Sequence, residues 1–249
     1  MERRKVNLFN TPIDALSLKD TVALVDHAIQ HQKQLHHIAV NVAKIVHMQT
    51  DKQLYESVVS ADVINADGLP LVWVSKWFRD PIPERVTGVD LMQALVKLAS
   101  EKGYRIFFFG AKEEVVSKVV RIYSDQYSSG IIAGYRNGYF NESEEAVIAN
   151  QIAKSGANLL FVAITSPKKE NFLFRQKEIL KKVNFVMGVG GSFDVVAGVV
   201  KRAPSWMQKI GLEWLFRIFQ EPKRMWKRYL TTNTLFVYYL AKEIIKRRR

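Results

Sequence analysis

The chain has 249 residues, 48% of them hydrophobic, and a formal net charge of +13. A chain of this length is near the size at which one hydrophobic core stops growing, so we expect one domain with an appendage rather than two domains. It contains no cysteine, which excludes disulfides and cysteine-bound metals and fits a reducing compartment.

Short apolar runs alternate with amphipathic runs from the N-terminus to about residue 200. The apolar runs are continuous enough to be strands buried on both faces, and the clearest helix starts at the N-cap Ser17. This alternation predicts an α/β fold over residues 1–203, with a Rossmann-like, mostly parallel sheet covered by helices on both faces. The predicted strands are residues 6–9, 37–40, 63–65, 106–109, 131–133, 159–164 and 185–189, and the predicted helices are residues 18–32, 69–78, 90–102, 113–127, 143–154 and 169–181.

The loops that follow predicted strands hold most of the chemically interesting residues. Ligands bind beyond the carboxyl ends of the strands in such sheets, so these loops are where a site is expected. They contain Asn41, Asp67 with Gly68, Gly110, residues 165–170 and residues 188–194.

Asp67 and Arg85 are candidate catalytic residues. A carboxylate fixed directly after a strand can act as a general base for a hydroxyl group. The alternative for Asp67 is the N-cap of the next helix. Arg85 follows two prolines in a loop, where a guanidinium can bind a phosphate bidentately or simply be solvated.

A glycine-rich turn follows the last predicted strand. At Gly188, Gly190 and Gly191 the missing β-carbons allow backbone N–H groups to approach a phosphate or a sugar. The turn continues through Asp194 into a basic hinge and Trp-rich helices. It lacks the third glycine of the dinucleotide-binding motif, and the chain has no GK[ST] or G-x-S-x-G motif, so NAD, ATP and serine-hydrolase functions lose their main support.

We predict neither a cofactor nor a metal. The chain has no Asp-x-Asp pair, an acidic motif that commonly holds a divalent ion. His27 and His31 lie four residues apart on a predicted helix, but they are expected on its solvated face. A metal-independent reaction is therefore favoured.

Ten of the thirteen net positive charges lie in residues 201–249. This asymmetry indicates an anionic partner, which could be a membrane surface, a pyrophosphate substrate or nucleic acid. The longest uncharged stretch there is too short and too polar for a membrane-spanning helix. Residues 204–249 are predicted to form a basic amphipathic appendage, either docked on the core or lying on an anionic membrane. Its apolar stripe comprises Trp226, Tyr229, Leu230, Val237, Leu240 and Ile244.

Three motifs carry a resemblance to a known family. These are NADG at residues 65–68, ERVTG at residues 84–88, and the run GVGGSFDVVAG, KRAP, WMQ, GLEWLFR and EPKR from residue 188 to residue 224. In this order they closely resemble the WecG/TagA/CpsF glycosyltransferases over nearly the whole chain. The resemblance implies an inverting enzyme that moves a hexosamine-type sugar, N-acetylmannosamine or a related one, from a UDP-sugar to a polyprenyl-diphosphate-linked sugar. Such enzymes serve cell-surface polysaccharide or teichoic acid synthesis.

The resemblance also implies roles for individual residues. Asp67 would be the catalytic base and Arg85 would lie near the diphosphate. Two positions depart from the family pattern: Ala39 replaces a hydroxyl residue, and Lys169 replaces a glutamine, which puts the sugar specificity in doubt. The implied substrate-binding residues are Asn41 and Lys169 for the sugar, Gly188, Gly190, Gly191 and Asp194 for the nucleotide, Tyr139 for its base, and Arg217, Arg224 and Arg228 for the diphosphate.

The implied protein is cytoplasmic and peripheral on the inner face of the cell membrane, and the absence of a signal-peptide pattern fits this. We expect no nucleic-acid partner, and self-association into a homo-oligomer stays open. Two functions of other classes remain as alternatives: a basic nucleic-acid-binding protein, and a noncatalytic membrane-surface scaffold.

Overall fold

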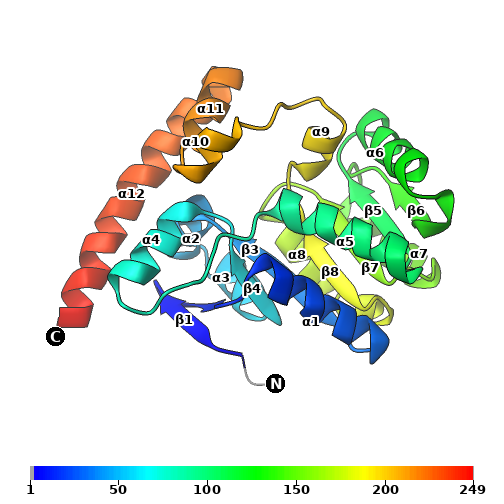
Figure 1. Cartoon of the computed structure of the whole chain (residues 1–249), viewed down its shortest axis with the longest axis horizontal. Helices are drawn as coiled ribbons and strands as arrows, with labels where there is room; N and C mark the ends of the chain where they lie inside the picture. Colours follow the sequence, from blue (N-terminus) through cyan, green and yellow to red (C-terminus); the bar gives the residue numbers. More distant parts are fainter. Residues whose placement is uncertain (1–2, 249) are drawn as a thin grey trace.

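The computed structural model describes residues 3–248, apart from the side chains of Arg224 and Arg248. Its centre is a six-stranded sheet with the strand order β4-β3-β8-β7-β5-β6 (Figure 1). All neighbouring strands in it are parallel, which confirms the predicted α/β fold. The strands are β3 (Leu35–Val40), β4 (Val63–Ala66), β5 (Ile106–Gly110), β6 (Ile132–Arg136), β7 (Leu159–Ala163) and β8 (Phe185–Gly188).

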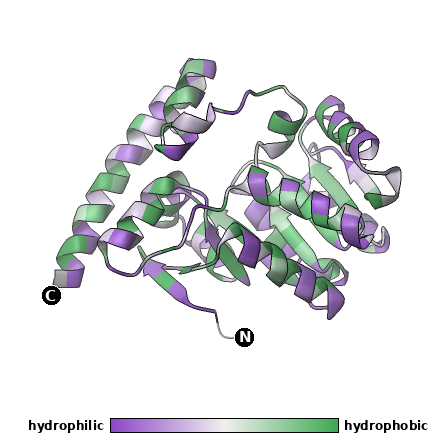
Figure 2. Ribbon diagram, viewed as in Figure 1, coloured by the Kyte–Doolittle hydropathy of each residue, from purple (hydrophilic) through white to green (hydrophobic). Residues whose placement is uncertain are grey.

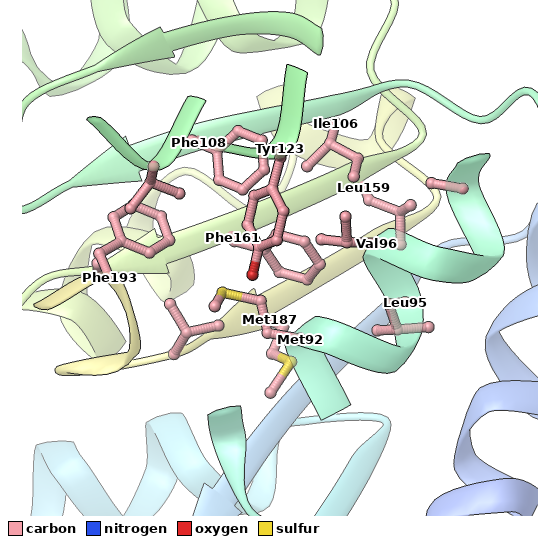
Figure 3. Close-up of a cluster of buried hydrophobic side chains, with 14 of the residues drawn as sticks. Met92, Leu95, Val96, Ile106, Phe108, Tyr123, Leu159, Phe161, Met187 and Phe193 are labelled. Carbon is pink, nitrogen blue, oxygen red and sulfur yellow. The ribbon is translucent and has the colours of Figure 1, made fainter. Parts of the chain in front are cut away.

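Helices cover both faces of the sheet because alternate side chains of its apolar strands point to opposite sides. Phe108 and Phe161 lie on one face and pack with Leu95 and neighbouring side chains (Figure 3). Phe107 and Leu160 point to the other face. The first face is covered by α1 (Leu18–Gln30), α5 (Gly88–Lys102), α6 (Glu113–Gln126) and α9 (Ser192–Val196), and the second by α2 (Val42–Met48), α3 (Lys52–Val59), α7 (Glu145–Lys154) and α8 (Lys168–Arg175).

The first predicted strand does not join this sheet, so that part of the prediction is wrong. Residues 5–8 form β1 (Lys5–Leu8), which pairs antiparallel with β2 (Thr11–Asp14) in a separate hairpin. Its turn places Phe9 and Asn10 at φ values of 52° and 60°, a left-handed conformation typical of tight hairpin turns. Asp14 then accepts a hydrogen bond from the Ile64 N–H at 2.8 Å, which ties the hairpin to the edge strand β4.

The predicted helices are largely confirmed, with two differences. The short helices α2 and α3 were not predicted; Asn41 and Asp51 are their N-caps. The helix predicted at residues 169–181 is broken, because α8 ends at Arg175 and a 3₁₀ turn, η3 (Ile179–Lys182), follows. The helix predicted after Asp67 forms as α4 (Leu69–Trp77), and two further 3₁₀ turns are η1 (Ser129–Ile131) and η2 (Glu142–Glu144).

The C-terminal segment forms α10 (Ser205–Lys209), α11 (Glu213–Gln220) and the long α12 (Pro222–Arg248), which runs along one side of the molecule (Figure 1). Helix α12 packs against α2, and Phe236 contacts Phe9 with ring centroids 5.3 Å apart. Within residues 3–248, no helix is long and apolar enough to span a bilayer.

The apolar stripe predicted for α12 is wrong in its details. One face is buried against the protein through Met225, Thr232 and Phe236. A second apolar face, with Trp226, Leu230 and Val237, points to solvent, and hydrophobic and hydrophilic residues accordingly alternate along this helix (Figure 2). Of the predicted stripe, Trp226, Leu230 and Val237 lie on this exposed face, whereas Tyr229, Leu240 and Ile244 are partly buried; the stripe included none of the buried residues.

Candidate active site

Most of the predicted site residues meet at the carboxyl edge of one half of the sheet. Asn41 follows β3, Asp67 follows β4, Gly188 ends β8, and Lys169 lies in the first turn of α8 after β7. Since β4, β3, β8 and β7 are consecutive neighbours, the topology brings these four positions to one edge. The loops after these strands therefore bring the four predicted residues to one edge, and their functional roles stay predictions.

Asp67 is held at the end of β4 by its own backbone. Its N–H donates to the Val40 carbonyl at 2.8 Å. Gly68, not Asp67, is the N-cap of α4, and no described side chain caps this helix. The alternative role as an N-cap is therefore wrong, and the Asp67 carboxylate is left for other partners.

The pKa of Asp67 is raised from 3.8 to about 6 because protein atoms bury the carboxyl group. Four charges modify this effect. Arg217 acts most strongly and lowers the pKa, Glu213 raises it, and Arg85 and Lys44 lower it. The result is a carboxylate that is ionised at neutral pH but is a stronger base than an ordinary aspartate.

Helix α11 lies over this edge and contributes charges to it. Glu213 forms an ion pair with the Arg85 guanidinium, and both side chains are largely shielded from solvent. Arg217, one turn further along α11, is exposed. The hinge before α10 is fixed separately, because Arg202 donates to both oxygens of Asp90 at 2.6 and 2.7 Å. The appendage therefore adds residues to the same group as Asp67 and Arg85.

Lys169 belongs to a buried cluster of three charged side chains at this edge of the sheet. Glu170 is fully buried, and one of its oxygens lies 2.9 Å from Lys44 Nζ and 3.3 Å from Lys169 Nζ. Burial alone would raise the pKa of Glu170, but the two lysines hold it well below its usual range. Burial lowers the pKa of Lys169 to about 8, so its ammonium group stays mainly protonated at neutral pH.

Gly188 differs from the other turn glycines in what surrounds it. A β-carbon at residue 188 would clash with Lys169 Cε, so the glycine makes room for the lysine side chain. Gly190 has a φ of 55°, which favours glycine, and the space around it is open. Asp194 follows in the short helix α9, beside Gly191. Only Gly190 and Gly191 therefore offer the open backbone that the sequence predicted for all three.

Tyr139 lies apart from this group, along the same edge of the sheet. It lines a cleft of about 610 Å³ beyond the ends of β5 and β7, and its side chain is 68% exposed. Lys168 borders the cleft and donates to the Phe140 carbonyl at 3.0 Å, with its ammonium 3.8 Å from the centre of the Phe140 ring. The cleft therefore lies beside the β5 and β7 part of the carboxyl edge.

Arg228 is exposed on α12 and lies near Tyr229, which packs on Trp214 with ring centroids 5.9 Å apart. Burial raises the pKa of Tyr229, and the charges acting on it include Arg217, Arg228 and Asp67. The Arg224 side chain falls outside the described residues. Sequence reasoning assigned no role to Lys44, Glu170, Glu213 or Tyr229, although Glu213 lies within the GLEWLFR motif and Glu170 within the predicted loop of residues 165–170.

The arrangement of potential metal ligands can also be described. From residue 3 to residue 248, no group of three or more histidine or acidic side chains is arranged to hold a metal ion. The positive charges near Asp67 are instead those of arginine and lysine side chains.

A parallel α/β sheet that places a carboxylate among arginines at its carboxyl edge is an arrangement suited to group transfer. The chain belongs to the WecG/TagA/CpsF glycosyltransferase family, whose sequence model matches residues 6–249. It is therefore a glycosyltransferase.

Two similar relatives come from bacilli. A Bacillus subtilis strain 168 protein named N-acetylglucosaminyldiphosphoundecaprenol N-acetyl-beta-D-mannosaminyltransferase is 36% identical over 193 residues, which cover 78% of this chain and 74% of the relative. A protein of the same name from Bacillus spizizenii strain W23 is 38% identical over 178 residues, covering 71% of this chain and 68% of the relative.

Proposed function

We propose that this glycosyltransferase moves a hexosamine-type sugar, N-acetylmannosamine or a related one, from a UDP-sugar to a polyprenyl-diphosphate-linked sugar with inversion at the anomeric carbon. The observation that carries the proposal is Asp67, a carboxylate with a raised pKa that lies at a strand end among Arg85 and Arg217. The names of the two relatives support the acceptor and the sugar class. The product would enter cell-surface polysaccharide or teichoic acid synthesis.

In the proposed reaction, Asp67 takes the proton from the acceptor hydroxyl as its oxygen attacks the anomeric carbon from the face opposite UDP. The bond from that carbon to the diphosphate oxygen breaks, and its electron pair leaves with UDP. Negative charge grows on the leaving diphosphate, and guanidinium groups stabilise it electrostatically. The proposed assignments are Arg85, Arg217, Arg224 and Arg228 for the diphosphate, Asn41 and Lys169 for the sugar, and Gly190, Gly191, Asp194 and Tyr139 for the nucleotide, while Gly188 makes room for Lys169.

The reaction is proposed to be metal-independent, since arginines can neutralise the diphosphate in place of a divalent cation. Transfer should therefore continue at the same rate in excess EDTA. Loss of activity in EDTA with recovery on adding Mg²⁺ or Mn²⁺ would show that a metal takes part.

The transfer experiment uses UDP-N-acetylmannosamine and UDP-N-acetylglucosamine with an N-acetylglucosaminyl diphosphate on a short prenyl chain as the acceptor. Asp67→Asn should reduce the rate about 10² to 10⁴-fold with little change in UDP affinity. Asp51→Asn is the matched control, because asparagine is an equally good N-cap for α3. A near wild-type rate for Asp67→Asn would remove it from the role of base.

The protein is further proposed to be cytoplasmic and to bind the inner face of the membrane through α12. The exposed apolar face with Trp226, Leu230 and Val237 lies on a helix rich in lysine and arginine, as in interfacial helices on anionic bilayers. Serine at these three positions should weaken binding to phosphatidylglycerol vesicles, whereas Val147→Ser, at an exposed position on α7, should not. Equal vesicle binding by both variants would exclude α12 as the membrane contact.

A further inference from the structure

Glu213 holds an unusual place in the site. It is the first residue of α11, a helix of which none of the eight described residues is buried. Its carboxylate nevertheless pairs with Arg85 across 128 sequence positions, with side-chain exposures of 26% for Glu213 and 14% for Arg85. An acidic side chain thus reaches from the appendage to one of the guanidinium groups assigned to the diphosphate.

The neighbouring charges distinguish the Glu213–Arg85 pair from the other arginine–carboxylate pair nearby. Arg202 is already neutralised by both oxygens of Asp90. Arg85 instead has an anionic partner that comes from outside the α/β core. A largely buried guanidinium without an anion is strongly destabilising, so the free enzyme needs a negative charge at this point.

A carboxylate and a phosphate offer the same kind of acceptor oxygens to a guanidinium, and both can bind its planar N–H groups. They therefore compete for Arg85 when a diphosphate enters. Because no residue of α11 is fully buried, the Glu213 carboxylate can move away from Arg85 at a smaller cost than a side chain fixed in the core.

We propose that Glu213 is a positioning residue of the transfer site: its carboxylate holds the Arg85 guanidinium in place as an internal anion and yields it to the diphosphate of the nucleotide. This inference rests on the proposed function, which assigns Arg85 to the diphosphate. Glu213 acts through Arg85 and touches no reacting atom. Its charge also sets how readily Asp67 ionises, because it opposes the effect of the surrounding cations.

Titration calorimetry with UDP tests the competition. Glu213→Gln removes the charge and keeps the size, so it should bind UDP about tenfold more tightly than the wild type at low salt. The gain should vanish in an Arg85→Ala background, because no guanidinium remains to be contested. Glu213→Asp keeps the charge and should bind UDP like the wild type, and Glu114→Gln, on the exposed start of α6, is the control.

A second readout is the pH dependence of transfer. The charged and titratable groups that act on or near Asp67 come from four helices and two loops, and Glu213 is the acidic one that raises its pKa. Glu213→Gln should therefore shift the acid limb of kcat/KM to lower pH, an effect that a purely structural role would not produce. These groups are Arg217 and Glu213 on α11, Lys44 on α2, Lys169 on α8, Tyr229 on α12, and the loop residues Arg85 and Arg202.

The outcomes separate the inference from the proposed function. Unchanged or weaker UDP binding by a folded Glu213→Gln variant overturns the inference and leaves the proposed function standing. A gain of equal size in the Arg85→Ala background also overturns it, since Glu213 would then repel UDP without competing for Arg85. If wild-type protein does not bind UDP, the proposed function fails and the inference with it. Glu213→Ala gives the same comparison if the glutamine variant folds poorly.

Discussion

Replacing Asp67 by asparagine should make the protein more stable while it abolishes most of the transfer. The carboxyl group is held where burial disfavours its charge, and its pKa is raised from 3.8 to about 6. An aspartate whose pKa is higher in the folded state binds its proton more tightly there than in the unfolded chain. Ionisation above the unfolded pKa therefore costs folding free energy, and asparagine removes this cost.

The size of the effect follows from the shift. At about 1.4 kcal/mol for each pKa unit, the ionised carboxylate costs about 3 kcal/mol at pH 8, where it is ionised in both states. At about pH 5 the folded protein keeps most of the proton, and the cost falls to about 1.5 kcal/mol. Below the unfolded pKa of 3.8 the difference disappears, because both states are protonated.

Urea unfolding of the wild type and of Asp67→Asn at these pH values measures the difference. The variant should gain about 2–3 kcal/mol in its free energy of unfolding at pH 8, with a melting temperature about 5–10 °C higher, and about half of that gain at pH 5. Asp51→Asn should show no such pH-dependent gain. A variant of Asp67 that is less stable than the wild type, or a gain that does not change with pH, would refute the reasoning. The carboxylate would then be stabilised by partners rather than held at a cost for catalysis.

Other substitutions test the neighbouring groups. Arg217→Ala removes the charge that most lowers the pKa of Asp67, so the acid limb of the pH–rate profile should move to higher pH. The transfer rate at pH 8 should also fall about 10²-fold. An acid limb at the wild-type pH would show that Arg217 does not act on Asp67. Lys169→Gln should change the ranking of UDP-sugar donors and have a smaller effect on the melting temperature. An unchanged ranking would mean that Lys169 serves only as a structural partner of Glu170. Gly188→Ala should destabilise the protein by about 1–3 kcal/mol, and this loss should be smaller when it is measured in a Lys169→Ala background, where the clashing side chain is gone. An equal loss in both backgrounds would contradict the close approach of the two residues.

The central sheet could be predicted from the sequence because its strands are short, apolar and buried on both faces. The hairpin was missed for a physical reason: its turn uses Phe9 and Asn10 at positive φ, whereas the sequence signal for such turns is glycine. The helices α2 and α3 were missed because segments of seven and eight residues show little periodicity.

The position of the candidate site could also be predicted from the sequence, since loops at strand ends are recognisable once the strands are. The long-range partners of the site residues could not be predicted. Glu213 meets Arg85 across 128 positions, and Lys44 meets Glu170 on another helix, so no local pattern relates them. The motif that contains Glu213 carried a family resemblance, but the residue had no assigned partner until the fold brought the two segments together.

The docking of α12 has a consequence for how the chain folds as it is made. This helix is synthesised after every other described element, yet it packs on the first ones: Phe236 covers Phe9, Lys246 donates to the Asn10 side chain at 3.2 Å, and Arg247 lies over the Phe78 ring. Segments emerge from the ribosome in order and begin to fold as they appear. The apolar surface around the hairpin and α2 must therefore wait uncovered until translation reaches α12. During that interval the nascent chain offers a binding surface to chaperones, which ribosome profiling of chaperone-bound chains could detect.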